Sequence, residues 1–176
     1  MSQITSSTSS TPVAASPSLR IIKIATCPTC TGKAKLTYHL GCKADKQLYL
    51  RISSNTGGGF FSAEWVAYQS IQATLASHPA DNPITSTAFI PLFQGKSTNT
   101  PGFLLAALVN EGLLKLAGDK QRGYHILSSD SFDTEMSKLM ASNIDLKVAP
   151  AVPITRESSA SKHKQSKPTI ATNTPS

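Results

Sequence analysis

The chain has 176 residues and carries 17 Lys and Arg against 10 Asp and Glu, a formal net charge of +7. Only 15% of its residues are charged, whereas roughly 25% is usual in soluble domains. Residues 1–18 and 149–176 are rich in Ser, Thr, Ala and Pro. Such segments cannot bury enough apolar surface to offset the entropy of ordering, so we expect both ends to be disordered. Residues 19–148 remain for one core or two small ones.

Several classes of protein are excluded by this composition. No apolar run approaches the roughly 18 residues that span a bilayer, so we expect no membrane association. The first residues lack the basic and apolar regions of a secretory signal. Three cysteines are an odd number for a disulfide framework. We therefore expect a cytoplasmic protein in a reducing compartment.

The positive charge is concentrated in one N-terminal segment and one tail. Residues 21–60 carry a net charge of +5 and residues 151–176 a net charge of +3, whereas residues 61–150 carry −2. An anionic partner would match this distribution, and nucleic acid is the commonest such partner. The alternative is that the charge only aids solubility.

The first part of the chain predicts β-structure. Residues 20–25 form a short apolar run that is suited to a strand. Residues 35–42 and 47–53 alternate between apolar and polar side chains on either side of a polar loop, residues 43–46, which predicts an antiparallel hairpin. The side chains expected to face inward are Leu36, Tyr38, Leu40, Cys42, Leu48, Leu50 and Ile52.

The next segments predict two helices. Ser62 can cap a helix over residues 62–77. Residues 85–93 predict a short second helix, in which Pro91 should cause a kink or a late start. The apolar face expected for the first helix consists of Trp65, Tyr68, Ile71 and Leu75.

The remainder predicts two more helices and a second hairpin. A Thr-Pro pair opens a third, strongly apolar helix over residues 100–111. Gly112 is suited to the left-handed position that follows a helix. Residues 113–116 and 124–127 predict two short strands joined by a polar loop. A last amphipathic helix is expected to begin at Asp130 or the next residue.

This order of elements resembles a winged helix-turn-helix domain over about residues 61–128. The most specific stretch is Leu104–Leu127, which combines an apolar third helix, a Gly-Leu-Leu exit, a polar wing and a Tyr-x-Ile return strand. In that family the third helix enters the DNA major groove and the wing contacts the neighbouring backbone. The predicted fold class is α+β, with an N-terminal antiparallel hairpin, a three-helix winged-helix domain that the resemblance implies, and a C-terminal helix. The expected divisions are 1–18 (disordered), 19–60 (basic hairpin), 61–128 (winged helix), 129–148 (C-terminal helix and extension) and 149–176 (disordered basic tail).

The resemblance implies a non-catalytic protein that binds duplex DNA as a regulator of transcription or as an accessory factor. Base reading would fall to residues in and before the third helix, namely Lys96, Ser97, Thr98, Asn99, Thr100 and Asn110. Phosphate contacts would fall to the wing and to the basic hairpin, namely Lys115, Lys120, Arg122, Lys43, Lys46 and Arg51.

The third helix departs from the pattern of a DNA reader. Residues 101–111 contain no Lys or Arg, whereas base readout relies mostly on Arg, Lys, Asn and Gln. The alternative is a winged-helix module that docks a protein partner or a second copy and does not bind DNA. Residues 50–66 also resemble small uncharacterised proteins of bacterial mobile elements, so a mobile-element accessory or defence-related factor stays open under this alternative.

The cysteines suggest one structural zinc. Cys27-Pro28-Thr29-Cys30 has the spacing of a zinc knuckle. His39 and Cys42 are the only nearby pair that could complete the site, which predicts the ligand set Cys27, Cys30, His39 and Cys42. Strand alternation places His39 and Cys42 on opposite faces unless Gly41 bends the chain. The alternative is a core cysteine at Cys42, an exposed His39 and two incidental thiols.

Other patterns carry little chemistry. The three glycines of residues 57–59 indicate a tight turn or a loop that approaches an anion. Tyr49 and Arg51 face outward on the basic hairpin, with Phe60 and Phe61 just beyond, and such aromatics can stack on single-stranded bases or simply pack. The spacing suggests no Ser/His/Asp or Cys/His pairing and no paired carboxylates. We therefore expect no enzyme and no small-molecule substrate.

Overall fold

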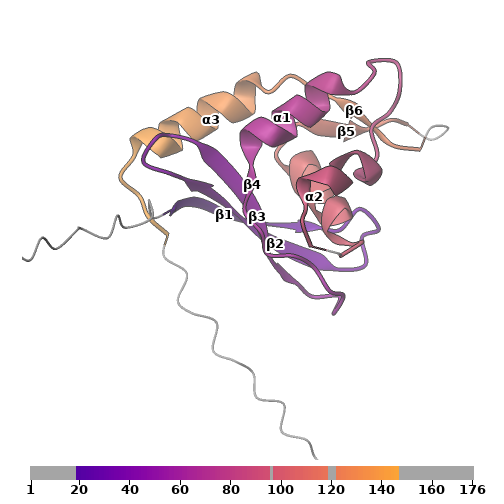
Figure 1. The fold of residues 1–176 in the computed structure, drawn as a ribbon, viewed down its shortest axis with the longest axis horizontal. Helices are drawn as coiled ribbons and strands as arrows, with labels where there is room; N and C mark the ends of the chain where they lie inside the picture. The colour runs from indigo at the N-terminus through magenta and orange to yellow at the C-terminus, as the bar shows by residue number, and fades with distance from the viewer. Residues whose placement is uncertain (1–18, 96, 119–121, 147–176) are drawn as a thin grey trace, which may run out of the picture.

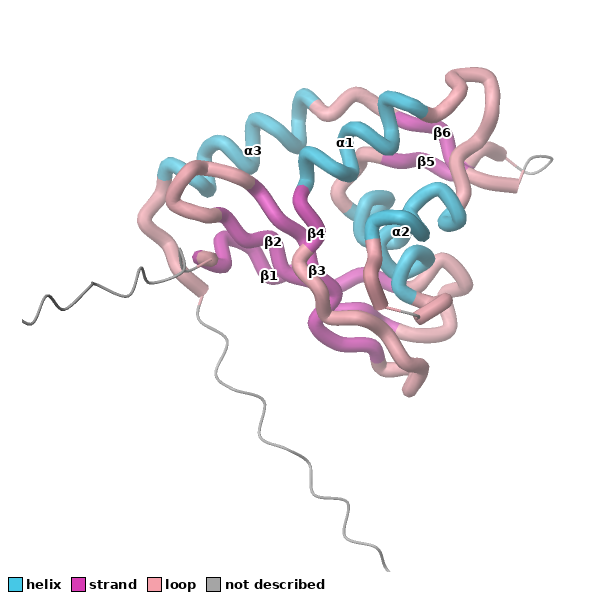
Figure 2. The backbone as a smooth tube through the Cα atoms, viewed as in Figure 1, coloured by secondary structure: helices cyan, strands magenta, loops and turns pink. Residues whose placement is uncertain are grey.

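The fold is mixed α+β, as the sequence predicts. The computed structural model describes residues 19–95, 97–118 and 122–146, and both segments predicted to be disordered lie outside these residues. A four-stranded antiparallel sheet in the order β1-β2-β3-β4 carries the helices on one face (Figure 1). A two-stranded hairpin lies at the far end of the helical layer (Figure 2). The elements are β1 (Arg20–Pro28), β2 (Lys35–Cys42), β3 (Leu48–Asn55), β4 (Val66–Ala67), α1 (Tyr68–Ser77), the 3-10 helix η1 (Ser86–Leu92), α2 (Thr100–Asn110), β5 (Leu114–Leu116), β6 (Tyr124–Ile126) and α3 (Asp130–Ala141).

The predicted N-terminal hairpin is confirmed as β2 and β3. Tyr38 pairs with Ile52 and Leu40 pairs with Leu50, and these inward side chains are at most 2% exposed. Strand β1 adds to the free side of β2 and extends beyond the apolar run at 20–25, because its backbone pairs with β2 as far as Pro28. The sheet therefore includes the first cysteine of the Cys-Pro-Thr-Cys sequence.

The predicted start of the first helix at Ser62 is wrong. Helix α1 begins at Tyr68, and the preceding Val66 and Ala67 form β4 by pairing with Leu50 and Tyr49 of β3. Backbone pairing with the sheet has overridden the helical spacing of the apolar residues. Trp65 consequently lies outside the helix.

The later elements follow the sequence closely. Residues 86–92 form a 3-10 helix that contains Pro91. Helix α2 is followed by Gly112 with a φ of +74°, the left-handed conformation expected there. Both strands of the second hairpin and helix α3 appear where the patterns predict them. Ile84 adds to this hairpin through reciprocal backbone hydrogen bonds of 2.8 and 2.9 Å with Tyr124.

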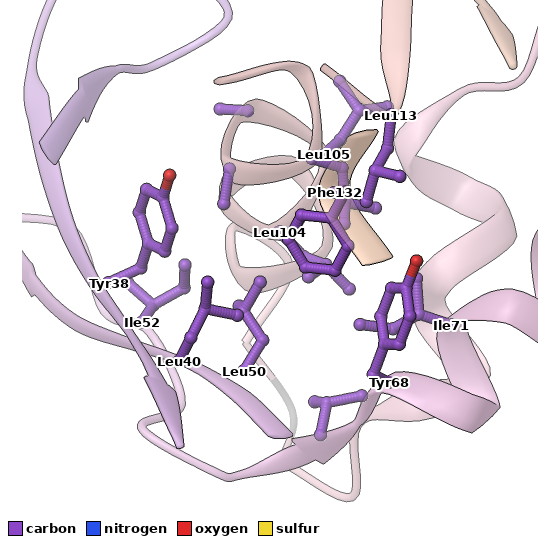
Figure 3. Packing of buried hydrophobic residues seen from close by; sticks show 14 of the residues in the cluster. Tyr38, Leu40, Leu50, Ile52, Tyr68, Ile71, Leu104, Leu105, Leu113 and Phe132 are labelled. Carbon is purple, nitrogen blue, oxygen red and sulfur yellow. The ribbon is translucent and has the colours of Figure 1, made fainter. Parts of the chain in front are cut away.

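One apolar core joins the sheet to the helices. Figure 3 shows side chains of β2 and β3 facing those of α1, α2 and α3. The segments predicted as a separate hairpin and a winged-helix domain therefore share a single core. Five consecutive residues of α2, Leu104–Leu108, are buried. A helix that is apolar on all sides is stable only when it is enclosed, and α2 accordingly packs against the sheet, η1 and β5.

Candidate functional site

Helix α2 does not present a free reading face. Its buried residues Leu104–Leu108 pack into the common core, and Thr100 is 0% exposed. At the other end of α2, the Asn110 Nδ2 donates a 2.7 Å hydrogen bond to the Tyr38 hydroxyl on β2. Of the six predicted reading residues, Thr100 and Asn110 are therefore engaged within the protein, and Lys96 lies outside the described residues.

The segment before α2 holds the loop that precedes β4. The Ser97 hydroxyl and the Asn99 amide donate hydrogen bonds of 2.7 and 3.1 Å to the Phe60 carbonyl. The Ser62 backbone N–H donates to the Thr100 hydroxyl at 2.8 Å. These side chains, predicted to read bases, thus fix the backbone around Phe60. The Phe60 ring itself is 92% exposed.

A groove of about 470 Å³ lies beside this loop. Most of its lining surface is apolar, and it is called the polar groove here for the Lys, Asn and Thr side chains among its lining residues. Its walls are the β1–β2 turn, the end of β3 with the glycines that follow it, and the start of α2. A Cβ on Gly57 would lie 3.0 Å from the Ala34 Cβ, and one on Gly59 would lie 3.0 Å from the Asn99 Nδ2. The glycines therefore let the loop close tightly on its neighbours. The lining side chains with polar groups include Lys33, Asn55, Thr98 and Asn99.

The sheet face opposite the helices, here called the outer face, collects basic and aromatic side chains. Because Leu36 and Tyr38 face the core, strand alternation directs Lys35 outward. Tyr49 and Arg51 also face outward, as the sequence predicts. The Lys43 ammonium lies 4.5 Å from the centroid of the Tyr49 ring.

Arg51 and Trp65 cover the middle of the outer face. The Arg51 guanidinium carbon lies 4.6 Å from the centroid of the Trp65 ring. Trp65 can lie against the sheet because Gly41 has no side chain, and a Cβ there would be 2.9 Å from the Trp65 Cη2. The sequence pattern does not reveal this position of Trp65 over the sheet, because the spacing of Trp65 predicts a helix.

His39 lies beneath this cover. Its ring is on the outer face by register, but it is only 3% exposed. Burial and the neighbouring Arg51 lower the pKa of His39. The neutral imidazole accepts from the Arg51 Nε, with 3.3 Å between that nitrogen and the His39 Nδ1. The alternative to the zinc site predicts an exposed His39, and this part of it is therefore wrong.

The charge on the outer face and its flanking turns is almost entirely positive. Asp45 is the only acidic residue of residues 21–60. Lys23 does not add to this surface, because it faces inward and bonds to Glu111 and Glu135. The basic side chains on the outer face and in its turns are Lys33, Lys35, Lys43, Lys46 and Arg51.

The structure does not bring the predicted zinc ligands together. Cys27 pairs with Leu36, whereas Cys42 lies six residues away along β2, about 20 Å at strand spacing. His39 faces the opposite side of the sheet from both cysteines. Among residues 19–95, 97–118 and 122–146, no three His, Cys, Asp or Glu side chains cluster as metal ligands do. The hairpin register is the physical reason for this separation.

A second, more apolar groove of about 310 Å³ lies between the end of β1, α2 and the β5–β6 hairpin. It is lined by Cys27, Cys30, Val109, Leu116 and Tyr124 among others. Burial, followed by the contact with Cys30, raises the pKa of Tyr124 to about 12, so its hydroxyl stays protonated. Lys115 and Arg122, predicted to contact phosphates, are exposed on this hairpin, whereas Lys120 lies outside the described residues.

Comparison with known proteins leaves the site to be interpreted from its geometry. No protein-family model, curated protein or solved structure matches the chain. Within the described part of the chain, no helix has the length and apolar character needed to cross a membrane.

Proposed function

We propose that this chain is a non-catalytic, cytoplasmic protein that binds nucleic acid through the outer face of its four-stranded sheet. The observation that carries the proposal is the shared face of Lys35, Lys43 and Arg51 with Tyr49 and Trp65. Phosphates are complementary to such a basic surface. Aromatic rings between cations offer a complementary surface to bases. No described helix covers this face (Figure 1).

The proposal differs from the winged-helix expectation in where the contact lies. The order α1, η1, α2 and β5–β6, with Ile84 added to the hairpin, supports the resemblance. However, the sheet lies against α2, the helix that reads DNA in that family. A nucleic-acid partner is therefore retained, and the contact moves from α2 to the sheet.

The test is fluorescence anisotropy of the full chain with labelled duplex and single-stranded oligonucleotides over rising salt. The variant combines Lys35→Ala, Lys43→Ala and Lys46→Ala, three exposed or half-exposed lysines of the sheet and its turn. Its salt slope should be shallower by about 2 to 3 units, because each lost phosphate contact removes about 0.7 to 0.9. The matched control combines Lys115→Ala and Arg122→Ala on the β5–β6 hairpin, and its slope should equal that of the wild type.

The results show whether the outer face of the sheet or the β5–β6 hairpin contacts nucleic acid. An unchanged slope in the triple variant would remove the sheet from the proposal. A shallower slope in the hairpin control would favour the winged-helix mode instead. Absence of binding by the wild type at low salt would overturn a nucleic-acid function altogether.

A second candidate is the docking of a protein partner or a second copy on the apolar groove. It is favoured by Leu116 of β5, which lines this groove and is 59% exposed. Exposed apolar side chains around a groove are typical of interaction sites. Light scattering over a concentration series tests the second-copy case: a dimer that Leu116→Asp converts to a monomer would support it.

A further inference from the structure

Phe60 is an exposed aromatic side chain on a fixed backbone. Its ring is 92% exposed, yet its carbonyl accepts hydrogen bonds from Ser97 and Asn99. Two residues later, the Ser62 N–H is bonded to Thr100, which is itself fully buried. The ring is thus presented to solvent from an anchored loop. Because the backbone is already fixed, covering this ring would order only its side chain, which reduces the entropic cost of binding.

The polar groove beside Phe60 has the size of a small-ligand site and one cation on its wall. Its volume of about 470 Å³ lies within the range of roughly 300 to 1,000 Å³ for small-ligand pockets. Lys33 on its wall supplies a positive charge for a phosphate.

Two Asn side chains on the walls of this groove each use one of their two amide atoms in a hydrogen bond within the protein. The Asn55 Oδ1 accepts from the Gly57 N–H at 2.9 Å, which leaves its Nδ2 as a donor. The Asn99 Nδ2 donates to Phe60, which leaves its Oδ1 as an acceptor. One available donor and one available acceptor match the edge of a nucleobase.

We infer that the nucleic acid bound by this chain is single-stranded, with one unpaired base stacked on Phe60 and its nucleotide seated in the polar groove. This inference rests on the proposed function. In a duplex, neither the faces nor the pairing edges of the bases are free, and extruding a base costs a few kcal/mol. An unpaired strand offers both to Phe60 and to the two amides at no such cost.

The outer face begins one residue beyond the groove, because Ala34 lines the groove and the exposed Lys35 begins β2. From Lys35 to Cys42 strand β2 covers about 23 Å at strand spacing, with Arg51, Trp65 and Tyr49 alongside. This length suits a site of several nucleotides. DNA and RNA share the phosphates and base faces that this surface contacts, so both strands are included in the test.

The experiment compares the full chain with Phe60→Ala and Phe60→Trp in anisotropy titrations against labelled oligo-dT, oligo-U and a mixed duplex at matched salt. The wild type should bind single strands at least tenfold more tightly than the duplex. Phe60→Ala should weaken single-strand binding by about 5- to 100-fold, the range for loss of one stacked base. Its salt slope should not change, because no phosphate contact is lost. Phe60→Trp should retain binding, and its added emission should be quenched by the bound base.

Two controls separate stacking from general damage. Ile90→Ala removes another exposed apolar side chain, 56% exposed and remote from the groove lining, and should bind as the wild type does. Lys33→Ala should reduce the salt slope by about 0.7, the single-strand value for one phosphate. Thermal unfolding of Phe60→Ala should match the wild type, since the ring makes few contacts.

The outcomes distinguish this inference from the proposed function. Equal affinity for duplex and single strands, or no effect of Phe60→Ala, would overturn the inference and leave nucleic-acid binding by the sheet in place. If neither form of nucleic acid binds, the proposed function fails and the inference fails with it. A preference for oligo-U over oligo-dT would assign the site to RNA, and the reverse to DNA.

Discussion

The ammonium of Lys23 lies 2.9 Å from the carboxylate of Glu111, whose side chain is only 2% exposed. The Tyr38 hydroxyl donates to the same carboxylate and accepts from Asn110. The Lys23 ammonium also contacts Glu135 of α3 at 2.8 Å. Burial alone would lower the pKa of Lys23, but its bonds to Glu135 and Glu111 outweigh this and raise it. This network joins β1 and β2 to the end of α2, which keeps the sheet against that helix.

Glu111→Ala should lower the free energy of unfolding by about 2 to 4 kcal/mol, because it removes the acceptor of the buried Tyr38 hydroxyl and the less exposed of the two carboxylates that bind Lys23. Urea unfolding followed by circular dichroism measures the change. Glu135→Ala is the matched control: its carboxylate is 50% exposed, so its loss should cost less than about 1 kcal/mol. Equal effects of the two substitutions would contradict the network.

Gly41→Ala should displace Trp65 from the outer face. The new Cβ would lie 2.9 Å from the Trp65 Cη2 and 2.0 Å from the Leu19 Cδ2. Such overpacking costs about 1 to 3 kcal/mol. Since Trp65 is the only tryptophan, a red shift of its emission reports the displacement directly.

Gly102→Ala serves as the control for Gly41→Ala. No heavy atom lies within 4 Å of its added Cβ, and the residue is helical. Its stability should be unchanged or raised by up to about 1 kcal/mol. A loss of stability as large as that of Gly41→Ala would mean that steric crowding at Gly41 is not the cause.

Stability should fall on mild acidification because of His39. Its folded pKa is lowered by burial and by Arg51, so the unfolded chain takes up a proton at a higher pH than the folded protein does. The contribution of the neutral His39 to the free energy of unfolding is complete above the ordinary histidine pKa of about 6.5. It is lost as the pH falls from there toward the lowered pKa of the folded protein. Urea unfolding between about pH 7.5 and 5.5 should show the loss in the wild type.

Two variants identify the group responsible for this acid sensitivity. His39→Gln should flatten the dependence of stability on pH in that window, because the titrating group is removed. The exposed His125 provides the comparison, and His125→Gln should behave as the wild type. An undiminished loss in His39→Gln would assign the effect to another group.

One of the three cysteines should react in the folded protein. Cys30 is exposed, whereas Cys27 and Cys42 are buried. Burial, and then the nearby Cys30 and Glu111, raise the pKa of Cys27 to about 11, which keeps its thiol protonated at neutral pH. Labelling with an aromatic disulfide reagent should modify Cys30 rapidly and the other two only after denaturation.

The same labelling tests the zinc prediction. Because the sheet register separates the predicted ligands, a chelator should alter neither the labelling of Cys30 nor the melting temperature. About one zinc per purified chain, with Cys30 protected until the chelator is added, would show that these cysteines bind metal after all.

Local patterns in the sequence were sufficient for most elements. The alternation of residues 35–42 and 47–53 predicts the hairpin, since a strand places successive side chains on opposite faces. The Thr-Pro start and Gly112 end bound helix α2. Tyr49 and Arg51 could likewise be assigned to the outer face from alternation alone. These features depend on neighbours in the chain, and their spacing is visible in the sequence.

The sequence by itself therefore determined the α+β class, the hairpins, α2 and α3, and the basic character of the N-terminal segment. Only the tertiary structure decided that α1 starts at Tyr68, that His39 is buried beneath Arg51, and that the segment before α2 anchors the Phe60 loop. It also decided that α2 packs against the sheet. Each of these features depends on contacts between residues remote in sequence, and periodicity and capping report only on local geometry.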